Sequence, residues 1–598
     1  MIHRLIATLA LVVASLALVG GADAGHRSLA GAPSLGSNVY VFDPSMSTSQ
    51  IQATVDSIAA QQVNNEFGSQ RYALLFKPGT YGSAADPLII NVGYYTEVAG
   101  LGASPTAVTI NGHVDVYNRC LAADNCLALV NFWRSVSNLT INVMGLDGCR
   151  SSGDFWAVSQ AAPMRRVDIT GGNLTLMDYC TAGPQFASGG FIADSKMGFV
   201  INGSQQQFFV RNGDVGGWSN GVWNQVFAGV NGAPAQSFPN PTYTTLPTTP
   251  VSREAPYLSL DAAGNYQVFA PSLRTASTGT TWANGPTAGL AIPISKFFIA
   301  QPTDSAKTIN AALGSGRNVI LTPGVYHLAQ PISVTRPDSI VLGLGFPTLV
   351  PTSGNAVLTT ASAKGILISG LIADAGATNS SVLMQIGGTH SKSDNEATDP
   401  STLTDVFFRI GGATAGSATT SLVVNSNNVI LDDIWAWRAD HGNGVGWTSN
   451  TADTGVVVNG DNVTALGLFV EHFQKTETIW NGSNGTDIFF QNEMPYDPPS
   501  QAAWMEAPGV DGYPAFKVGD GVTRFNGYGM GSYSFFNQGI DIFSANAFEV
   551  PTGLPAGSLH DLLTVFLSGN GGIQNVVNGT GGPTSSTPGV PTTVLSYP

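Results

Sequence analysis

Two copies of one sequence pattern constrain the fold of this chain more than any other feature. The first copy has the motif Pro-Gly-x-Tyr at Pro78 and Gly-Leu-Gly at Gly100, and the second has the same motifs at Pro323 and Gly343. Because both motifs recur at almost the same offset, the chain contains two tandem units of one architecture. A length of 598 residues also exceeds what one compact core accommodates.

Each unit follows the same plan. A helical segment is expected first, over residues 49–62 and again over 304–313. Short apolar runs follow, separated by Gly, Asn, Asp or Ser at a spacing of roughly 20–30 residues. Such runs fit the rungs of a right-handed parallel β-helix, whereas an antiparallel sandwich needs frequent two-residue hairpin turns, which are scarce here. The sequence therefore predicts an all-β fold of two tandem right-handed parallel β-helix domains.

Changes in composition set the predicted domain boundaries. The segment 236–293 is rich in Pro, Thr and Ser and is interpreted as a linker. It is long for a loop, so we expect it to be ordered against both halves. The N-terminal domain then spans 35–235 and the C-terminal domain 294–577. A Gly-, Thr- and Pro-rich tail over 578–598 is expected to pack loosely.

The first 24 residues have the features of a secretory signal peptide. An apolar run over 5–19 follows Arg4, and the segment 22–24 (Ala-Asp-Ala) has the small-x-small pattern of a cleavage site. Because the run is short for a bilayer span, we expect a secreted protein without a membrane anchor.

The four cysteines lie close together in the first half, at Cys120, Cys126, Cys149 and Cys180. In an exported protein an even, clustered set predicts two disulfides. Pairing Cys120 with Cys126 and Cys149 with Cys180 is the simplest arrangement, but all three pairings remain open. The spacings differ from the C-x₂-C pairs of zinc sites, so neither a metal nor a cofactor is expected.

The formal net charge of −15 narrows the choice of partner. An acidic surface repels phosphate backbones, so we expect no nucleic-acid partner. A neutral polysaccharide is compatible with such a surface, although charge alone does not select one. We expect the chain to act as a monomer.

Three acids in the second half have the spacing expected for a carboxylate site. Glu471 and Glu493 lie 22 residues apart, each after an apolar run, and Asp440 lies one longer step earlier. In a β-helix, residues one rung apart stack on the same face, and glycosidic cleavage uses a pair of carboxyl groups. Aromatic rings that could stack on sugar faces lie nearby. On spacing alone, a sugar-cleaving site and ordinary surface acids are both open readings. The aromatic candidates are Trp435, Trp437 and Trp480.

Longer motifs make the chain resemble the β-1,3-glucanases of glycoside hydrolase family 55. The resemblance extends from about residue 37 to the C-terminus, and motifs of this length in this order are highly specific. Two features depart from the bacterial pattern of that family: the cysteine-bearing insertions and the segment 211–214. Neither coincides with the predicted catalytic residues, but both bear on the loops of the cleft. The matching motifs lie at 71–81, 157–163, 187–195, 216–224, 250–254, 438–442, 469–473 and 491–493.

The resemblance implies a pectate-lyase-like double β-helix that hydrolyses β-1,3-glucan with inversion and releases glucose from a chain end. By motif, the general acid falls on Glu493, and Glu471 helps to activate a water held by Gln160 and Ser188. Asp440 and Tyr496 fall on sugar-binding positions. The site would then span both halves of the chain.

Two other functions compete with hydrolysis. A polysaccharide lyase of this fold would need a calcium-binding carboxylate cluster and basic residues for an anionic uronate, and the chain has only 24 Lys and Arg against 39 Asp and Glu. A non-catalytic glycan-binding β-helix would tolerate the loss of Glu493.

Overall fold

The computed structural model describes residues 33–388 and 397–598. The predicted signal peptide, residues 1–24, lies outside the described residues. Within the described part, none of the helices is long and apolar enough to cross a membrane. From Ser34 onward the chain forms one compact unit.

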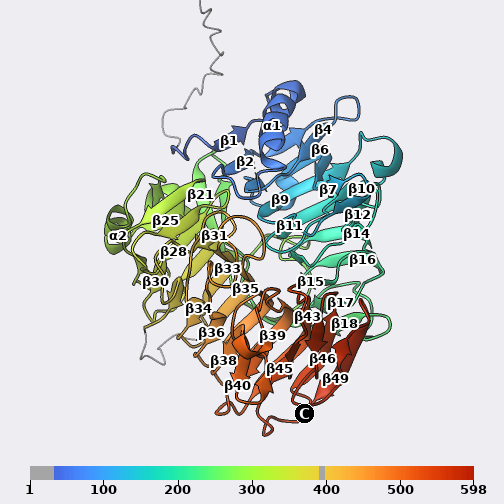
Figure 1. Cartoon of the computed structure of the whole chain (residues 1–598). Helices are drawn as coiled ribbons and strands as arrows, with labels where there is room; N and C mark the ends of the chain where they lie inside the picture. The colour runs from blue at the N-terminus through green and yellow to red at the C-terminus, as the bar shows by residue number, and fades with distance from the viewer. Residues whose placement is uncertain (1–32, 389–396) are drawn as a thin grey trace, which may run out of the picture. The chain divides into compact units, whose positions relative to one another are not determined.

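The first half is a parallel β-helix, as predicted. Its strands pair in parallel from rung to rung, for example with Leu74 opposite Val98 (Figure 1). One wall consists of β1 (Val39–Phe42), β2 (Tyr72–Phe76), β5 (Thr96–Gly100), β9 (Arg134–Val143), β11 (Met164–Thr170), β13 (Phe191–Ala193), β15 (Gln207–Arg211), β17 (Asn224–Ala228) and β18 (Tyr243–Leu246). The strands paired beside it are β3 (Gly79–Tyr81), β4 (Leu88–Asn91), β6 (Val108–Asp115), β10 (Gly153–Phe155), β12 (Asn173–Thr175), β14 (Lys196–Ile201) and β16 (Asp214–Ser219).

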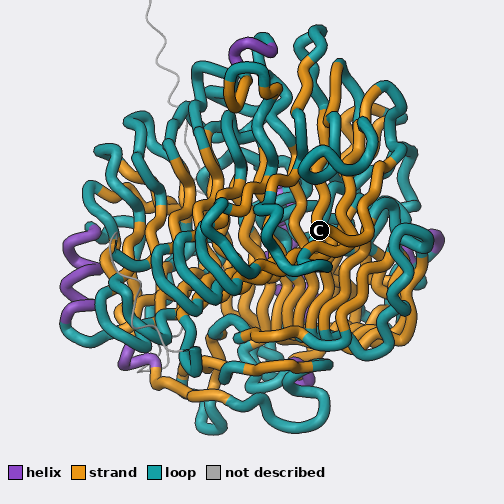
Figure 2. The backbone as a smooth tube through the Cα atoms, turned by 90° about the horizontal axis from the view of Figure 1, so that it is seen from below, coloured by secondary structure: helices purple, strands orange, loops and turns teal. Residues whose placement is uncertain are grey.

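The second half repeats this architecture, and its strands stack as regular rungs in Figure 2. The wall nearest the first half consists of β24 (Phe297–Ala300), β25 (Asn318–Leu321), β28 (Ile340–Gly343), β31 (Leu367–Asp374), β33 (Ser401–Ile410), β35 (Val429–Arg438), β37 (Thr464–Glu471), β39 (Gly485–Glu493), β43 (Phe525–Ser534), β46 (Leu559–Phe566) and β49 (Pro591–Tyr597), with β26 (Val325–Leu328) and β29 (Thr348–Pro351) alongside. A second wall consists of β27 (Ile332–Val334), β30 (Leu358–Thr360), β32 (Met384–Ile386), β34 (Thr420–Val424), β36 (Thr454–Val458), β38 (Thr478–Trp480), β42 (Phe516–Val518) and β45 (Phe548–Glu549). Smaller strands are β40 (Met505–Ala507), β41 (Val510–Asp511), β44 (Ile542–Ser544), β47 (Gly571–Ile573) and β48 (Thr584–Ser585).

A helix follows the first strand of each half, where the sequence predicts one. Helix α1 (Thr48–Gln62) starts at a capping box in which Ser47 and Gln50 satisfy each other's backbone N–H groups. Its apolar face, with Ile51 and Val55, packs into the first core. Helix α2 (Ala306–Gly314) is N-capped by Ser305 and packs into the second core in the same way. Each helix thus covers apolar side chains at the start of a β-helix that solvent would otherwise reach. Short 3₁₀ turns lie at Pro105–Ala107, Gly148–Arg150, Ile294–Lys296 and Gln501–Ala503.

The segment between the halves is ordered and antiparallel. Strands β19 (Thr249–Ser252) and β22 (Arg274–Ser277) pair with each other, and β20 (Tyr257–Leu260), β21 (Tyr266–Pro271) and β23 (Gly289–Pro293) form a small sheet. The prediction of a loosely packed tail is wrong. Strand β49 pairs antiparallel with β46 and forms the last strand of the main wall.

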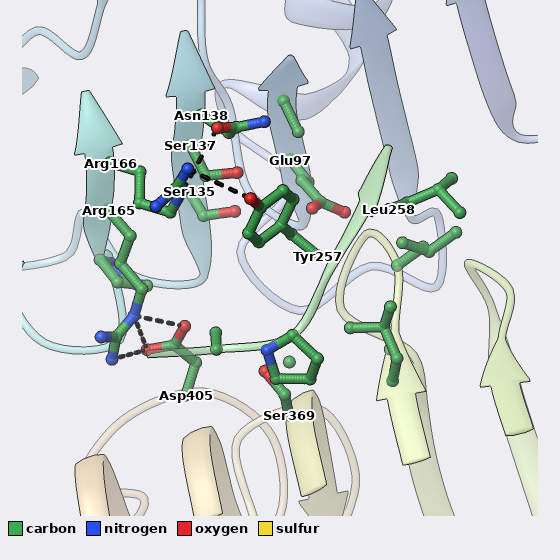
Figure 3. A pocket seen from close by; sticks show the side chains of 18 of the residues that line it. Glu97, Ser135, Ser137, Asn138, Arg165, Arg166, Tyr257, Leu258, Ser369 and Asp405 are labelled. Carbon is green, nitrogen blue, oxygen red and sulfur yellow. Dashed lines mark hydrogen bonds and ion pairs between the residues drawn. The ribbon is translucent and has the colours of Figure 1, made fainter. Parts of the chain in front are cut away.

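Buried ion pairs and aromatic rings hold the two halves together. Arg165 on β11 contacts Asp405 on β33 at 2.7 Å and Asp432 on β35 at 3.0 Å. Figure 3 shows Arg165 reaching Asp405 across this junction. Arg211 on β15 also contacts Asp432, at 2.6 Å, and pairs with Glu254 of the linker at 2.5 Å. Guanidinium groups that are buried without counter-charges would be strongly destabilising, so this network favours one fixed docking of the halves.

Candidate active site

The carboxyl ends of β35, β37 and β39 meet the first half at one end of the junction. Trp437 lies opposite Glu471 in register. The pairing of Phe469 with Gln491 places Glu493 in the same position one rung further. The spacing of 22 residues therefore does correspond to one rung. Asp440 does not stack on Glu471 as the spacing predicts. Trp437 occupies that register position on the preceding rung, and Asp440 lies three residues beyond it.

A cavity of about 860 Å³ lies at this end of the junction. Both halves contribute to its walls, so the structure brings together residues that are far apart in the sequence. Seven of the predicted site residues line it: Gln160, Ser188, Trp437, Asp440, Glu471, Glu493 and Tyr496.

A chain of hydrogen bonds crosses from the first half to the second inside this cavity. The Ser188 hydroxyl donates to Gln160 Oε1 at 2.8 Å. Gln160 Nε2 donates to Glu471 Oε1 at 2.8 Å and to Gln491 Oε1 at 3.2 Å. All these side chains are buried. The Ser188 oxygen can therefore still accept a hydrogen bond from a molecule in the cavity.

Glu471 accepts an N–H bond on each of its oxygens. Gln160 binds Oε1, and Trp435 Nε1 donates to Oε2 at 2.8 Å. Burial and the neighbouring charge of Glu493 raise the pKa of Glu471, while the hydrogen bond from Trp435 acts in the opposite direction. The two carboxyls are thus close enough for each to disfavour ionisation of the other.

Glu493 is the carboxyl with fewer donors. Burial raises the pKa of Glu493 to about 7, although a hydrogen bond from the Tyr496 hydroxyl to Oε2 lowers it. His472 Nε2 lies 4.0 Å from the same oxygen. Burial lowers the pKa of His472, and its Nδ1 lies 3.1 Å from the Met494 carbonyl. A neutral ring that donates from Nδ1 leaves Nε2 unprotonated toward Glu493.

The sequence motifs alone do not identify the triad of Asp440, His441 and Glu66, of which Asp440 and His441 line the cavity. His441 Nδ1 lies 2.8 Å from Asp440 and its Nε2 lies 2.6 Å from Glu66. Burial lowers the pKa of His441, but the two carboxylate bonds outweigh it and raise that pKa to about 10. Burial likewise raises the pKa of Asp440, and the hydrogen bond and charge of His441 oppose it, so that the pKa is lowered to about 2. His441 lies inside the motif at 438–442, whereas nothing in the sequence around Glu66 indicates a site.

The three predicted tryptophans have different positions. Trp480 is fully buried in the core of the second half, in contact with Phe516 and Phe525. Its prediction as a sugar-stacking residue is wrong, because β38 belongs to the other wall of the β-helix and its side chain points inward. Trp435 is also fully buried and contacts Glu471 rather than the cavity. Of the three, Trp437 lines the cavity.

The cysteine-bearing insertions form part of the cavity rim. The pairings Cys120–Cys126 and Cys149–Cys180 are both present, so the simplest prediction is confirmed. The first disulfide closes the hairpin of β7 (Arg119–Ala122) and β8 (Asn125–Leu127). Leu121 of this hairpin and Phe186 of a neighbouring loop both line the cavity, and their exposed fractions are 56% and 53%. Apolar surface thus lies on the rim of the cavity that holds the two carboxyls.

Comparison with known proteins agrees with this description. The model of the LAM55 pectate lyase-like domain matches residues 297–493. An exo-beta-1,3-glucanase from Streptomyces sp. (strain SirexAA-E / ActE) is 48% identical over 576 residues, which cover 96% of this chain and 91% of that protein. The solved structure of sacteLam55A from Streptomyces sp. SirexAA-E has a TM-score of 0.89 and covers 95% of this chain and 100% of its own. A variant of sacteLam55A in complex with glucose has a TM-score of 0.88.

Fold and cavity together define a class: proteins of two docked parallel β-helices with buried carboxyls at the junction. Identity at this level over nearly the whole chain narrows the class to one family. The chain belongs to glycoside hydrolase family 55.

Proposed function

We propose that this chain is a secreted exo-acting β-1,3-glucanase that hydrolyses laminarin-type glucan with inversion and releases glucose. The observation that carries the proposal is the chain Ser188–Gln160–Glu471, which ends in the same cavity as Glu493. The relative named an exo-beta-1,3-glucanase, and the sacteLam55A variant with bound glucose, support the substrate class.

Glu493 is the proposed general acid. A raised pKa of about 7 keeps this carboxyl protonated at mildly acidic pH, as a donor to the leaving glycosidic oxygen requires. Tyr496 donates to Oε2, which leaves Oε1 available to carry the proton. Asp440 and Trp437 border the same space and are proposed to contact the sugar.

Glu471 is the proposed base for the attacking water. The two buried carboxyls repel each other's charge, so the pair retains a proton as the pH approaches neutrality. Two N–H donors favour the charge on Glu471, whereas Glu493 accepts a single hydroxyl bond, so the proton belongs on Glu493. The Ser188 oxygen accepts a hydrogen bond from water, and Glu471 receives the proton that the water loses. Separate acid and base carboxyls with water between them are the requirement for inversion.

Product analysis on laminarin, with cellulose and pectin as controls, tests the proposal. We expect glucose as the main early product from laminarin alone. An early ladder of oligosaccharides would indicate endo cleavage, and an unsaturated product from pectin would indicate a lyase.

Glu493→Gln tests the assignment of the acid. The variant is expected to fold and to bind laminarin, but to lose about 10²–10⁴-fold in kcat, because an amide donates no proton to the leaving group. Asp487→Asn is the matched control, since Asp487 is a buried carboxyl on the same strand that does not line the cavity. Unchanged glucose release by Glu493→Gln would rule out its role as acid.

A further inference from the structure

A second group of ionisable side chains lies in the first half, outside the glucanase cavity. His113 and Asp115 stand two residues apart on β6, and Asp154 lies on β10. All three side chains are fully buried, with exposed fractions of 0%. One ligand atom from each lies within 4.8 Å of the others. Neither the glucanase chemistry nor the junction between the halves uses this group.

The polar atoms of this group are only partly satisfied by the protein. Asp154 Oδ1 accepts the Val114 N–H at 2.8 Å, but its Oδ2 has no hydrogen-bond partner among the described residues. Neither ring nitrogen of His113 has a partner there either. Its Nδ1 lies 3.4 Å from Asp115 Oδ2 without the geometry of a hydrogen bond. A buried polar atom without a partner is costly, so unpartnered atoms that converge on one point indicate a ligand.

Asp115 is the anchored member of the group. Its Oδ1 accepts the Phe155 N–H at 2.7 Å, and its Oδ2 accepts the Tyr117 hydroxyl at 2.5 Å. These bonds fix the carboxylate against both rungs. On the neighbouring strand β4, Asn91 lies opposite Asp115 in register, and its Oδ1 is also buried without a partner. A further oxygen thus lies one rung away on the same face.

The cation that lies over the Tyr117 ring, beside this group, is already paired. The Arg150 guanidinium lies 3.9 Å from the centre of the Tyr117 ring and forms a 2.8 Å ion pair with Asp178, whose side chain is fully buried. It therefore neutralises Asp178 rather than Asp115 or Asp154. Among the described residues, the two buried carboxyls and the imidazole then have no cationic side chain as a partner. Protein interiors tolerate such a group when the charges are paired or bind a metal.

We propose that His113, Asp115 and Asp154 bind a divalent first-row transition metal, with Zn²⁺ as the best-fitting ion. An imidazole nitrogen with two carboxylate oxygens is a ligand set for zinc, whereas calcium prefers oxygen ligands alone. At metal–ligand distances of about 2.0–2.1 Å, tetrahedral ligands lie about 3.4 Å apart, and the separation of His113 Nδ1 from Asp115 Oδ2 is 3.4 Å. The metal joins β6 to β10, and β10 ends at Phe155, five residues before Gln160.

Metal content of the purified full-length chain tests the site directly. The chain is expressed in medium supplemented with zinc, passed through gel filtration and measured by elemental analysis. We expect close to one zinc per wild-type chain and at least a tenfold lower content in Asp154→Asn and in His113→Gln. These two near-isosteric changes remove one ligand each and keep the volume of the side chain. The matched control is Asp487→Asn, which removes a fully buried carboxyl with two unpartnered oxygens in the second half and should retain the zinc.

Thermal unfolding gives a second readout that is independent of glucan hydrolysis. Removal of zinc with a chelator should lower the Tm of the wild-type chain and of Asp487→Asn, and added zinc should restore it. Asp154→Asn and His113→Gln should show neither change. Wild-type protein without bound zinc, or variants that bind zinc as well as wild type does, would overturn the proposal.

Discussion

At the scale of single residues, the surroundings of two similar glutamates make them chemically different. Both are buried at equivalent positions on neighbouring rungs. Glu471 accepts two N–H bonds, from Gln160 and Trp435, whereas Glu493 accepts one hydroxyl bond from Tyr496. Hydrogen bonds to a carboxylate stabilise its charged form, so the difference in donors separates the proposed roles of base and acid.

The pH profile of the wild-type chain follows from the proposed acid, Glu493. Because the pKa of Glu493 is raised to about 7, the carboxyl is protonated below that pH and ionised above it. We expect kcat/KM on laminarin to fall tenfold per pH unit once the pH exceeds about 7. A steady-state pH series measures this limb. A profile that stays flat through pH 9 would contradict the assignment.

Trp435→Phe tests the hydrogen-bond donor to Glu471, the proposed base. Loss of the indole N–H removes a bond that favours the charged form, so the pKa of Glu471 rises further and the acidic limb of the profile moves to higher pH. Trp480→Phe is the matched control. It makes the same change in a buried indole whose Nε1 has no partner among the described residues, far from the carboxyls in the other wall. If both variants shift the limb equally, the effect is one of packing.

At the scale of elements, strand register explains what was predictable. The one-rung spacing of Glu471 and Glu493 is visible in the sequence because strands of a β-helix repeat in register. The same reasoning failed for Trp480, because an apolar run does not reveal to which wall a strand belongs. It also failed for Asp440, since the rung before Glu471 is longer and its last residues leave the strand. Gln160 and Glu471 are 311 positions apart, so only the family resemblance connected them in the sequence.

The disulfide-closed hairpin and the loop beside it extend the rim of the cavity. Phe186 is 53% exposed there, and an aromatic face next to a sugar contributes about 0.5–1.5 kcal/mol. Phe186→Ala should therefore raise KM for laminarin about two- to tenfold, with little change in kcat. Phe199→Ala is the control, because Phe199 is 44% exposed on β14 and does not line the cavity. Equal KM values for wild type and Phe186→Ala would show that Phe186 on the rim does not contact the substrate.

At the scale of the whole molecule, the two β-helices are held in one arrangement by buried charge. Asp432 contacts both Arg165 and Arg211, and all three are buried. The tandem repeat predicts two similar halves, but it carries no information about which faces pack together. The inter-half contacts depend on single Arg and Asp residues that the repeat pattern does not distinguish from surface charges.

Asp432→Asn should destabilise the docked molecule. It removes the carboxylate that Arg165 and Arg211 share and leaves each guanidinium with one other carboxylate, Asp405 or Glu254, a change that costs up to about 3 kcal/mol in the free energy of unfolding. The shift of the urea midpoint measures it. Asp453→Asn is the control, because the Lys475–Asp453 pair is exposed and contributes less than about 1 kcal/mol. Equal midpoints for the two variants would show that the network does not hold the halves together.

The bond from Gln160 to Glu471 also has a consequence for how the enzyme matures. The groups proposed to hold the water belong to a β-helix that is translated before the acid and the base exist. Each β-helix can complete its own rungs, yet neither contains the full reaction centre. In a refolding experiment, circular dichroism would therefore recover before glucose release does. The recovery of glucose release from laminarin would then measure the docking of the two halves.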